Sequence, residues 1–252
     1  MRKILAVCHR EFRSYFHIPM ALIVLPSFLA LTGFYFYTCL VNFQLQVVPR
    51  AGIIKVEGIN INDHLLVPFF NQVIYVLMLV VPVVTMRLVA EEKRAGTWEL
   101  LLTYPVRSWE VLVGKYLGAL FFMFLLLLLT LPFPASLFLL GRPELPIIAS
   151  TYLGIILFII FYVACGLWSS LITENQVIAA LICFGISLGF IVLRWLAAVS
   201  PPPFEDFFAH LLLIDHIANF SRGIIQFSYV LIFPSMTALV LLACFRQMDK
   251  RR

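Results

Sequence analysis

Six long stretches of this 252-residue chain, each of 19 residues or more, lack Asp, Glu, Lys, Arg and His altogether. A helix needs roughly 20 apolar residues to cross the hydrocarbon core of a bilayer. Because lipid offers no partners to backbone polar groups, each stretch is expected to be an α-helix. The continuous apolarity also differs from the alternating pattern of an outer-membrane barrel. The six stretches are 18–49, 65–86, 116–141, 145–173, 175–193 and 223–245.

The overall composition supports the same conclusion. Hydrophobic residues make up 62% of the chain, charged residues 12%, and the mean hydropathy is +1.01. A soluble domain is about 45–50% apolar, and a soluble fold with this composition would expose large apolar patches and aggregate. We therefore predict an all-α integral membrane protein with six transmembrane helices.

The distribution of Lys and Arg predicts how the chain is oriented. Of the 18 such residues, four precede the first stretch, five lie between the second and third, and four follow the last. The positive-inside rule then places both termini in the cytoplasm, in a multi-pass protein of the inner (cytoplasmic) membrane. Topology and contact with anionic membrane lipid account for the net charge of +5, so no nucleic-acid partner is expected.

The chain is interpreted as one transmembrane domain over residues 1–252. Residues 1–17 show apolar side chains on one helical face and basic ones on the other, which predicts an amphipathic helix in the membrane interface. A plain basic flank is the alternative. Two small-xxx-small pairs, Gly114/Gly118 and Gly185/Gly189, could allow close helix packing. The six spans are expected over 18–41, 65–89, 112–140, 147–172, 177–199 and 225–246.

The segment 201–223, PPPFEDFFAHLLLIDHIANFSRG, separates the last two spans and is unusually apolar for a loop. Three prolines end the fifth helix, and apolar residues then recur near helical spacing. We expect short re-entrant helices here, with an ordinary interfacial helix as the alternative. Four side chains here are of metal-ligand types, but their spacing matches no recognisable metal site: Asp206, His210, Asp215 and His216.

Several kinds of chemistry find no support in the sequence. Apart from Arg194, near the end of the fifth span, no acidic, basic or histidine residue lies in the middle of a span, whereas ion-coupled carriers usually place such groups within the bundle. The serines within spans have no His at matching depth, and no G-x-x-x-x-G-K-[ST] phosphate loop occurs. The five cysteines form no disulfide framework or C-x-x-C motif. We therefore expect no enzyme activity and no cofactor, with energy for any transport coming from another chain.

The segment 90–115, AEEKRAGTWELLLTYPVRSWEVLVGK, concentrates charge between the second and third spans. Arg87 with Glu91, and Glu91 with Arg94, are spaced to pair along the end of the second helix. Gly96 is expected to end that helix.

A second, short helix is expected directly after Gly96. Thr97 is placed to cap it and Pro105 to end it, while Ser108 is placed to cap the third span. The result is a stiff helical elbow over residues 90–108, suited to docking a partner and transmitting force.

This segment resembles the signature region of ABC-2-type transporter permeases, roughly E-(K/R)-x-x-G-T-x-E-x-L-L-x-x-P-(V/I)-(S/R)-x-x-E-(I/V)-x-x-G-K. A second segment, HIANFSRGII at His216–Ile225, is similar to the end of gliding-motility-type and nitrous-oxide-reductase-accessory-type permeases. Residues 227–230 depart from that subtype, whose members tend to carry charges there. The signature positions are occupied by Glu92, Gly96, Thr97, Glu99, Leu101, Leu102, Pro105, Glu110, Gly114 and Lys115.

The resemblance implies the membrane subunit of an ABC exporter, with ATP bound by a separate ABC ATP-binding subunit. A second permease copy or a paralogue would complete the pathway. The segment 1–17 would be the connecting helix, Glu91–Arg107 the coupling helix, and Thr173–Gln176 a minor contact. A membrane scaffold without transport activity is the alternative, and the substrate stays open. The predicted coupling residues are Glu91, Glu92, Arg94, Gly96, Thr97, Glu99 and Pro105.

Overall fold

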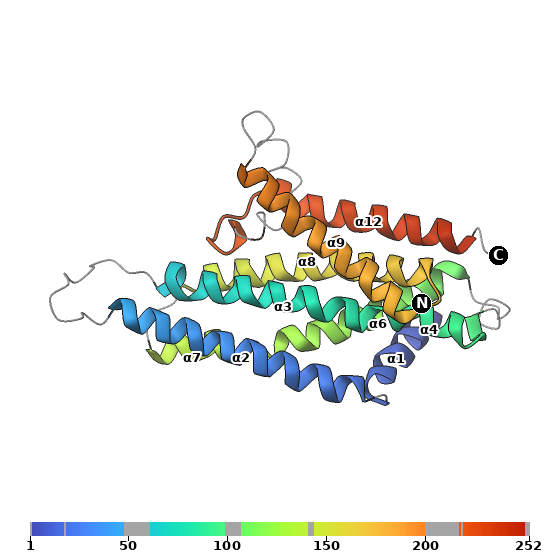
Figure 1. The fold of residues 1–252 in the computed structure, drawn as a ribbon, viewed down its shortest axis with the longest axis horizontal. Coiled ribbons are helices and arrows are strands. Elements are labelled where there is room, and N and C mark those ends of the chain that lie inside the picture. The colour runs from blue at the N-terminus through green and yellow to red at the C-terminus, as the bar shows by residue number, and fades with distance from the viewer. Residues whose placement is uncertain are drawn as a thin grey trace.

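The computed structural model describes residues 2–17, 19–47, 61–98, 107–140, 144–199, 217 and 219–249. Among these residues every regular element is a helix (Figure 1). In chain order the helices are α1 (Arg2–His17), α2 (Met20–Val47), the π-helix η1 (Asn62–Leu66), α3 (Val67–Thr85), α4 (Arg87–Arg94), α6 (Ser108–Leu128), α7 (Pro132–Leu140), α8 (Leu145–Ile172), α9 (Gln176–Val199) and α12 (Phe227–Asp249).

Six helical runs are long and apolar enough to cross a membrane, which confirms the predicted fold class. The second run is formed jointly by η1, α3 and α4, and the third by α6 and most of α7. The runs are Met20–Leu45, Asn62–Arg94, Ser108–Leu139, Leu145–Ile172, Gln176–Leu196 and Phe227–Asp249.

The third run is broken between α6 and α7, where the sequence suggested one continuous span. The amides of Thr130 and Leu131 bond three residues back, at 3.0 and 3.1 Å, rather than four. Pro132 follows directly, and a proline has no N–H with which to continue the helical ladder. The helix therefore tightens into a turn and restarts as α7.

Helix α8 lies at the centre of the bundle. It packs against α3, α4, α6, α9 and α12. In its most apolar window 72% of the residues are buried, compared with 17% in α9 and in α12. Those two helices, and α2 with 28%, therefore present most of their apolar surface outward.

The long helices run roughly along one axis, and several elements meet at one end of the bundle (Figure 1). Helix α1 lies there, next to α4, and α12 ends there, on the right in this view. We call this the α1 end. The loop between α8 and α9, at Thr173–Asn175, is also there because α8 ends and α9 begins at this end.

The described residues 217 and 219–220 are helical and dock against the opposite end of α8. The Ser150 hydroxyl donates to the Phe220 carbonyl at 2.7 Å, and the Phe220 ring is fully buried. Gly223 ends the turn with a φ of 78°, a left-handed conformation that favours glycine. The predicted re-entrant helices fall mainly on 200–216, which lie outside the described residues.

Candidate functional site: the charged cluster at the α1 end

Helix α4 starts where the long second span breaks at Met86. Pro82, within α3, cannot donate a hydrogen bond to the Met78 carbonyl four residues earlier. The Tyr162 hydroxyl of α8 lies 3.2 Å from that carbonyl and equally far from the Cys183 carbonyl, so its one proton serves both acceptors. The chain then turns at Met86 and continues as α4.

Ser170 of α8 caps the start of α4 from outside the helix. Its Oγ accepts the amides of Val89 and Ala90, each at 3.0 Å, and donates to the Met86 carbonyl at 3.0 Å. The first amides of a helix have no partner within it, so a hydroxyl here satisfies groups that burial would otherwise leave unpaired. Lys93 also donates to the Leu171 carbonyl near the end of α8. Helix α4 is thus bonded to α8 at both of its ends.

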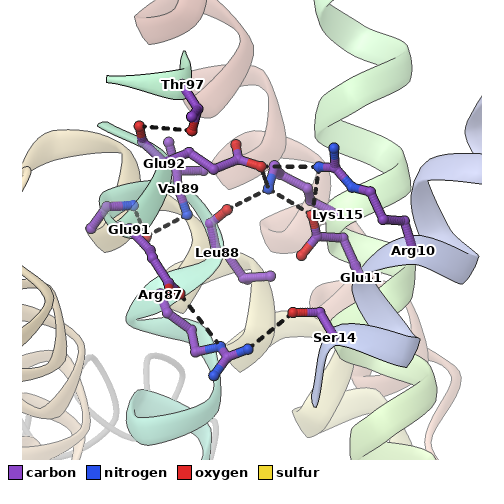
Figure 2. A network of polar contacts seen from close by, with 12 residues as sticks. Arg10, Glu11, Ser14, Arg87, Leu88, Val89, Glu91, Glu92, Thr97 and Lys115 are labelled. Atoms are coloured by element: carbon purple, nitrogen blue, oxygen red, sulfur yellow. Dashed lines mark hydrogen bonds and ion pairs between the residues drawn. The ribbon is translucent and has the colours of Figure 1, made fainter. Parts of the chain in front are cut away.

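Lys115 of α6 is the buried charge at this end, with 1% of its side chain exposed. An ammonium group has three N–H donors, and all three are matched by acceptors here. Its Nζ lies 2.8 Å from Glu11 Oε1, 2.9 Å from Glu92 Oε1 and 2.6 Å from the Leu88 carbonyl oxygen. The buried Lys115 therefore joins α6 to α1 and to α4 (Figure 2).

Arg10 completes the charged cluster, which we define as Arg10, Glu11, Glu92 and Lys115. Its Nη2 lies 3.0 Å from both Glu11 Oε1 and Glu92 Oε1. Burial opposes ionisation of Glu11, but the positive charges of Lys115 and Arg10 and their hydrogen bonds outweigh it and lower its pKa. Two acids and two bases share the cluster, so its charges balance.

A second polar link joins α1 to α4 beside the cluster. Arg87 donates to the Ser14 hydroxyl at 3.2 Å, and its guanidinium lies 5.3 Å from the centre of the Tyr15 ring. Tyr15 is buried, stacks on Phe122 of α6 and donates to the Val84 carbonyl at 3.3 Å. Burial raises the pKa of the Tyr15 hydroxyl, so it stays protonated as a donor.

Two glycines allow α1 to lie close against α6. A Cβ at Gly114 would come within 2.7 Å of Val7 Cβ, and one at Gly118 within 2.7 Å of Glu11 Cβ. Such distances are too short for real carbon atoms, so these positions require glycine for the helices to approach. The pair Gly114/Gly118 therefore allows close helix packing, as expected. At Gly185 and Gly189 no atom lies within 4 Å of a Cβ, so this pair mediates no such contact among the described residues.

The amphipathic helix predicted over 1–17 is present as α1, but its apolar side chains divide between two environments. Cys8 and Tyr15 are buried against the bundle, while Leu5 and Phe16 remain exposed. Glu11 is 13% exposed because its carboxylate points into the cluster. Helix α1 is therefore bound to the protein along one side.

A cavity of about 330 Å³ opens beside the cluster. Its walls carry both signs of charge, and it lies between α1 and α4. Among the residues that line it are Arg10, Ser14, Arg87, Glu91, Glu92 and Thr97. Within the part of the chain that the structure describes, no group of three His, Cys, Asp or Glu side chains is arranged to hold a metal ion.

The predicted coupling residues separate into those that face inward and those that face outward. The Glu92 side chain is 19% exposed, and its carboxylate bonds within the cluster. The Glu91 side chain is 47% exposed, and its Oε2 lies 3.8 Å from Arg87 Nε. Arg94 is exposed.

Gly96 and Thr97 follow the end of α4. Gly96 has a φ of 68° and ends the helix as predicted, with its amide donating to the Lys93 carbonyl at 3.1 Å. The Thr97 hydroxyl donates back to the Glu92 carbonyl at 3.3 Å. Glu99 and Pro105 lie outside the described residues, as does most of the predicted short helix.

The start of α6 differs by one residue from the expectation. Arg107 is its N-cap, and Ser108 is the first helical residue. The Glu110 carboxylate reaches back and accepts the Arg107 amide at 3.0 Å. A Glu at the third helical position is a common partner for the residue before a helix, so the difference is local.

Sequence reasoning did not assign a role to Arg10, Glu11 or Lys115, although they form most of the cluster. Two signals were present. Glu11 is the only acid within the basic segment 2–17, and Lys115 is the last charge before a long uncharged stretch. These signals mark the two residues, but the sequence does not show that α1 folds back onto α6 and brings them together.

Comparison with known proteins finds one family match. A family model described as "ABC-2 family transporter protein" matches residues 16–245, which is nearly the whole chain. A search of curated proteins gives no match.

Proposed function

The chain belongs to the family of ABC-2 transporter proteins, and from this premise we propose that it is the permease subunit of an ATP-driven exporter whose α4 receives the movement of a separate ATP-binding subunit. The family already identifies a multi-pass membrane component of an ABC transporter. Export as the direction, the inner membrane as the location and cytoplasmic termini are parts of the proposal.

The observation that carries the proposal is the bonding of α4. This eight-residue helix is linked to α1 and α6 through the charged cluster and to α8 through Ser170 and Lys93. Packed elements joined by buried polar bonds move as units rather than deforming gradually. A force applied to α4 would therefore be passed to three other helices at once.

The proposed cycle follows from that connection. An ATP-binding subunit would dock at the α1 end, against the exposed side of α4 and the segment that follows it. Closure of two such subunits on ATP would displace α4, and α1, α6 and α8 would follow. In this cycle ATP would favour one arrangement of the helices and substrate the other. Hydrolysis would remove the preference that ATP gives, and the bundle would return to its starting state.

The structure suggests different roles for the predicted coupling residues. Glu91, whose side chain is half exposed, and Arg94, which is exposed, are the proposed contacts with the ATP-binding subunit, together with Glu99 and Pro105. Glu92 would act as a positioning residue that fixes α4 to the cluster, and Gly96 would set the direction in which the chain leaves α4. Thr97, bonded back to the Glu92 carbonyl, would support the same turn.

A second permease, either another copy or a paralogue, is also part of the proposal. The support is the outward apolar surface of α2 and α9, which a bilayer or a partner helix must cover. ATP would be bound only by the partner subunits, and the permease itself would carry no cofactor and catalyse no reaction.

A pull-down from detergent-solubilised membranes tests the proposal. The native chain should recover an ABC ATP-binding subunit and ATP hydrolysis, and the double variant Glu91→Lys with Arg94→Glu should lose both. Arg246→Glu, an exposed position near the end of α12, is the control and should behave as the native chain does. Recovery of a partner without ATPase activity would contradict the exporter and favour the membrane scaffold.

A further inference from the structure

We propose that a groove between α1 and α6 binds an anionic membrane phospholipid, with an acyl chain along α6 and the headgroup beside the basic side of α1. The inference concerns a surface away from the charged cluster and does not depend on the proposed coupling to an ATP-binding subunit. It begins from the apolar side of α1 that packing against α6 leaves uncovered.

The groove has a defined shape and an almost wholly apolar lining. Its volume is about 460 Å³, within the range of roughly 300–1,000 Å³ that is usual for ligand pockets. His9 is its only polar side chain. The apolar walls include Leu5, Cys8 and Phe12 of α1 and Phe121, Phe124 and Leu128 of α6.

A second apolar cavity continues the groove along α6 towards α8. Its volume is about 470 Å³, and it shares Phe124 and Leu128 with the first. Tyr152 contributes its ring to this cavity, and its hydroxyl lies 3.0 Å from Thr130 Oγ1. The two cavities are neighbours along α6, and we call them together the apolar track, which extends from α1 into the membrane-spanning part of the bundle.

The position of the track indicates that a lipid acyl chain occupies it. Phe124, Leu128 and Leu131 lie within the run Ser108–Leu139, which is one of the six that can span a bilayer. Phe121 and Leu128 are 52% and 60% exposed, so the track opens sideways, where a spanning helix meets lipid. In that environment the molecules available to fill an apolar track are lipid chains.

The basic side chains of α1 favour a lipid with an anionic headgroup. His9 lines the groove, and Arg13 follows one turn later on the same helical face, with its side chain exposed. The only acid of α1 is Glu11, whose carboxylate is held in the charged cluster. The groove therefore has basic groups at its α1 end and no competing carboxylate from that helix, which is the arrangement that attracts acidic lipid headgroups.

Native mass spectrometry of the detergent-purified chain tests the proposal, with phosphatidylglycerol and phosphatidylethanolamine added separately as probes. We expect one phosphatidylglycerol to be retained in preference to phosphatidylethanolamine. Arg13→Gln should weaken phosphatidylglycerol binding by about fivefold, the usual contribution of one Arg near an acidic surface, and His9→Gln, which removes the polar side chain of the groove, should also weaken it. Leu128→Trp should abolish retention by filling the track.

Two control variants separate the groove from general effects. Arg246→Gln removes a basic residue at the α1 end without touching the groove, and Leu139→Trp adds the same bulk at an exposed site on α7. Both should retain the lipid as the native chain does. Since Leu128 is exposed, its replacement should leave folding intact, which the thermal unfolding midpoint checks.

Three results would overturn the proposal. Equal retention of the two lipids would exclude recognition of the headgroup charge. Unchanged binding in Leu128→Trp would place the lipid elsewhere. A dimer that disappears in Leu128→Trp, with no lipid retained by the native chain, would show that the groove holds a second copy of the chain.

Discussion

Lys115 Nζ lies 2.8 Å from Glu11 Oε1, although 104 positions separate the two residues in the chain. The contact fixes the N-terminal helix against the start of α6 and includes Glu92 of α4 in the same cluster. Three segments that are distant in sequence thus meet around one buried ammonium group.

Removing that ammonium group should destabilise the protein strongly. Lys115→Met leaves the Glu11 and Glu92 carboxylates near each other without their buried counter-charge, which typically costs about 3–5 kcal/mol. Denaturant unfolding in detergent measures the loss. Arg94→Met, an exposed position, should change stability by less than about 0.5 kcal/mol. If Lys115→Met with Glu92→Gln is as unstable as the sum of the single variants, the two residues are not coupled as described.

Stability should fall in acid because of Glu11. Its pKa is lowered in the folded protein from the usual value of 4.5, so its contribution is present above about pH 4.5 and is lost as the pH falls through the folded pKa. Unfolding midpoints between pH 7 and pH 3 measure this slope. Glu11→Gln should show a shallower decline below about pH 4.5 than the native chain does. Identical slopes would mean that Glu11 is not ionised within the cluster.

The crossing of α1 over α6 should require glycine. Gly114→Ala and Gly118→Ala add a Cβ that would lie 2.7 Å from Val7 Cβ and Glu11 Cβ, and overpacking of this kind costs about 1–3 kcal/mol. The same change at Gly189, where nothing lies within 4 Å, should be neutral or slightly stabilising. Thermal unfolding compares the three. A loss at Gly189 as large as the loss at Gly114 would contradict the close approach.

Ser170 should protect the first turn of α4. Ser170→Ala leaves the buried amides of Val89 and Ala90 without their acceptor, at a cost of about 1–3 kcal/mol. Hydrogen exchange at these two amides should accelerate, whereas Ser235→Ala, at an exposed site on α12, should not change them. Unchanged exchange in Ser170→Ala would show that α4 does not depend on α8 for its start.

Much of the fold could be predicted because hydropathy alone specifies helices that cross a bilayer. The six spans and the helix end at Gly96 follow from local residue patterns, namely uncharged runs and a glycine that adopts a left-handed conformation. The break before Pro132 is also encoded locally, but the continuous apolarity on both sides conceals it.

The charged cluster could not be predicted because it depends on tertiary packing. The spacing of Glu91, Glu92 and Arg94 indicates a charged helix, but not which carboxylate faces inward. That choice depends on where α1 crosses α6, and nothing near Glu92 in the sequence encodes it. The contact between the Tyr162 hydroxyl and the Met78 carbonyl could not be predicted either. That carbonyl lacks a helical donor because of Pro82 in α3, whereas Tyr162 lies on α8.

The most direct test of the central claim is the distance between α1 and α12 in the complex with the ATP-binding subunit, measured with and without ATP. All five native cysteines are buried, so spin labels at Ala6→Cys and Leu239→Cys, both exposed, can be attached selectively. We predict that ATP changes the distance between the two labels in the protein with the native charged cluster. In Glu92→Gln, with the ATP-binding subunit still bound, the change should be smaller. An unchanged distance with ATP, or an equal change in Glu92→Gln, would contradict transmission through the charged cluster.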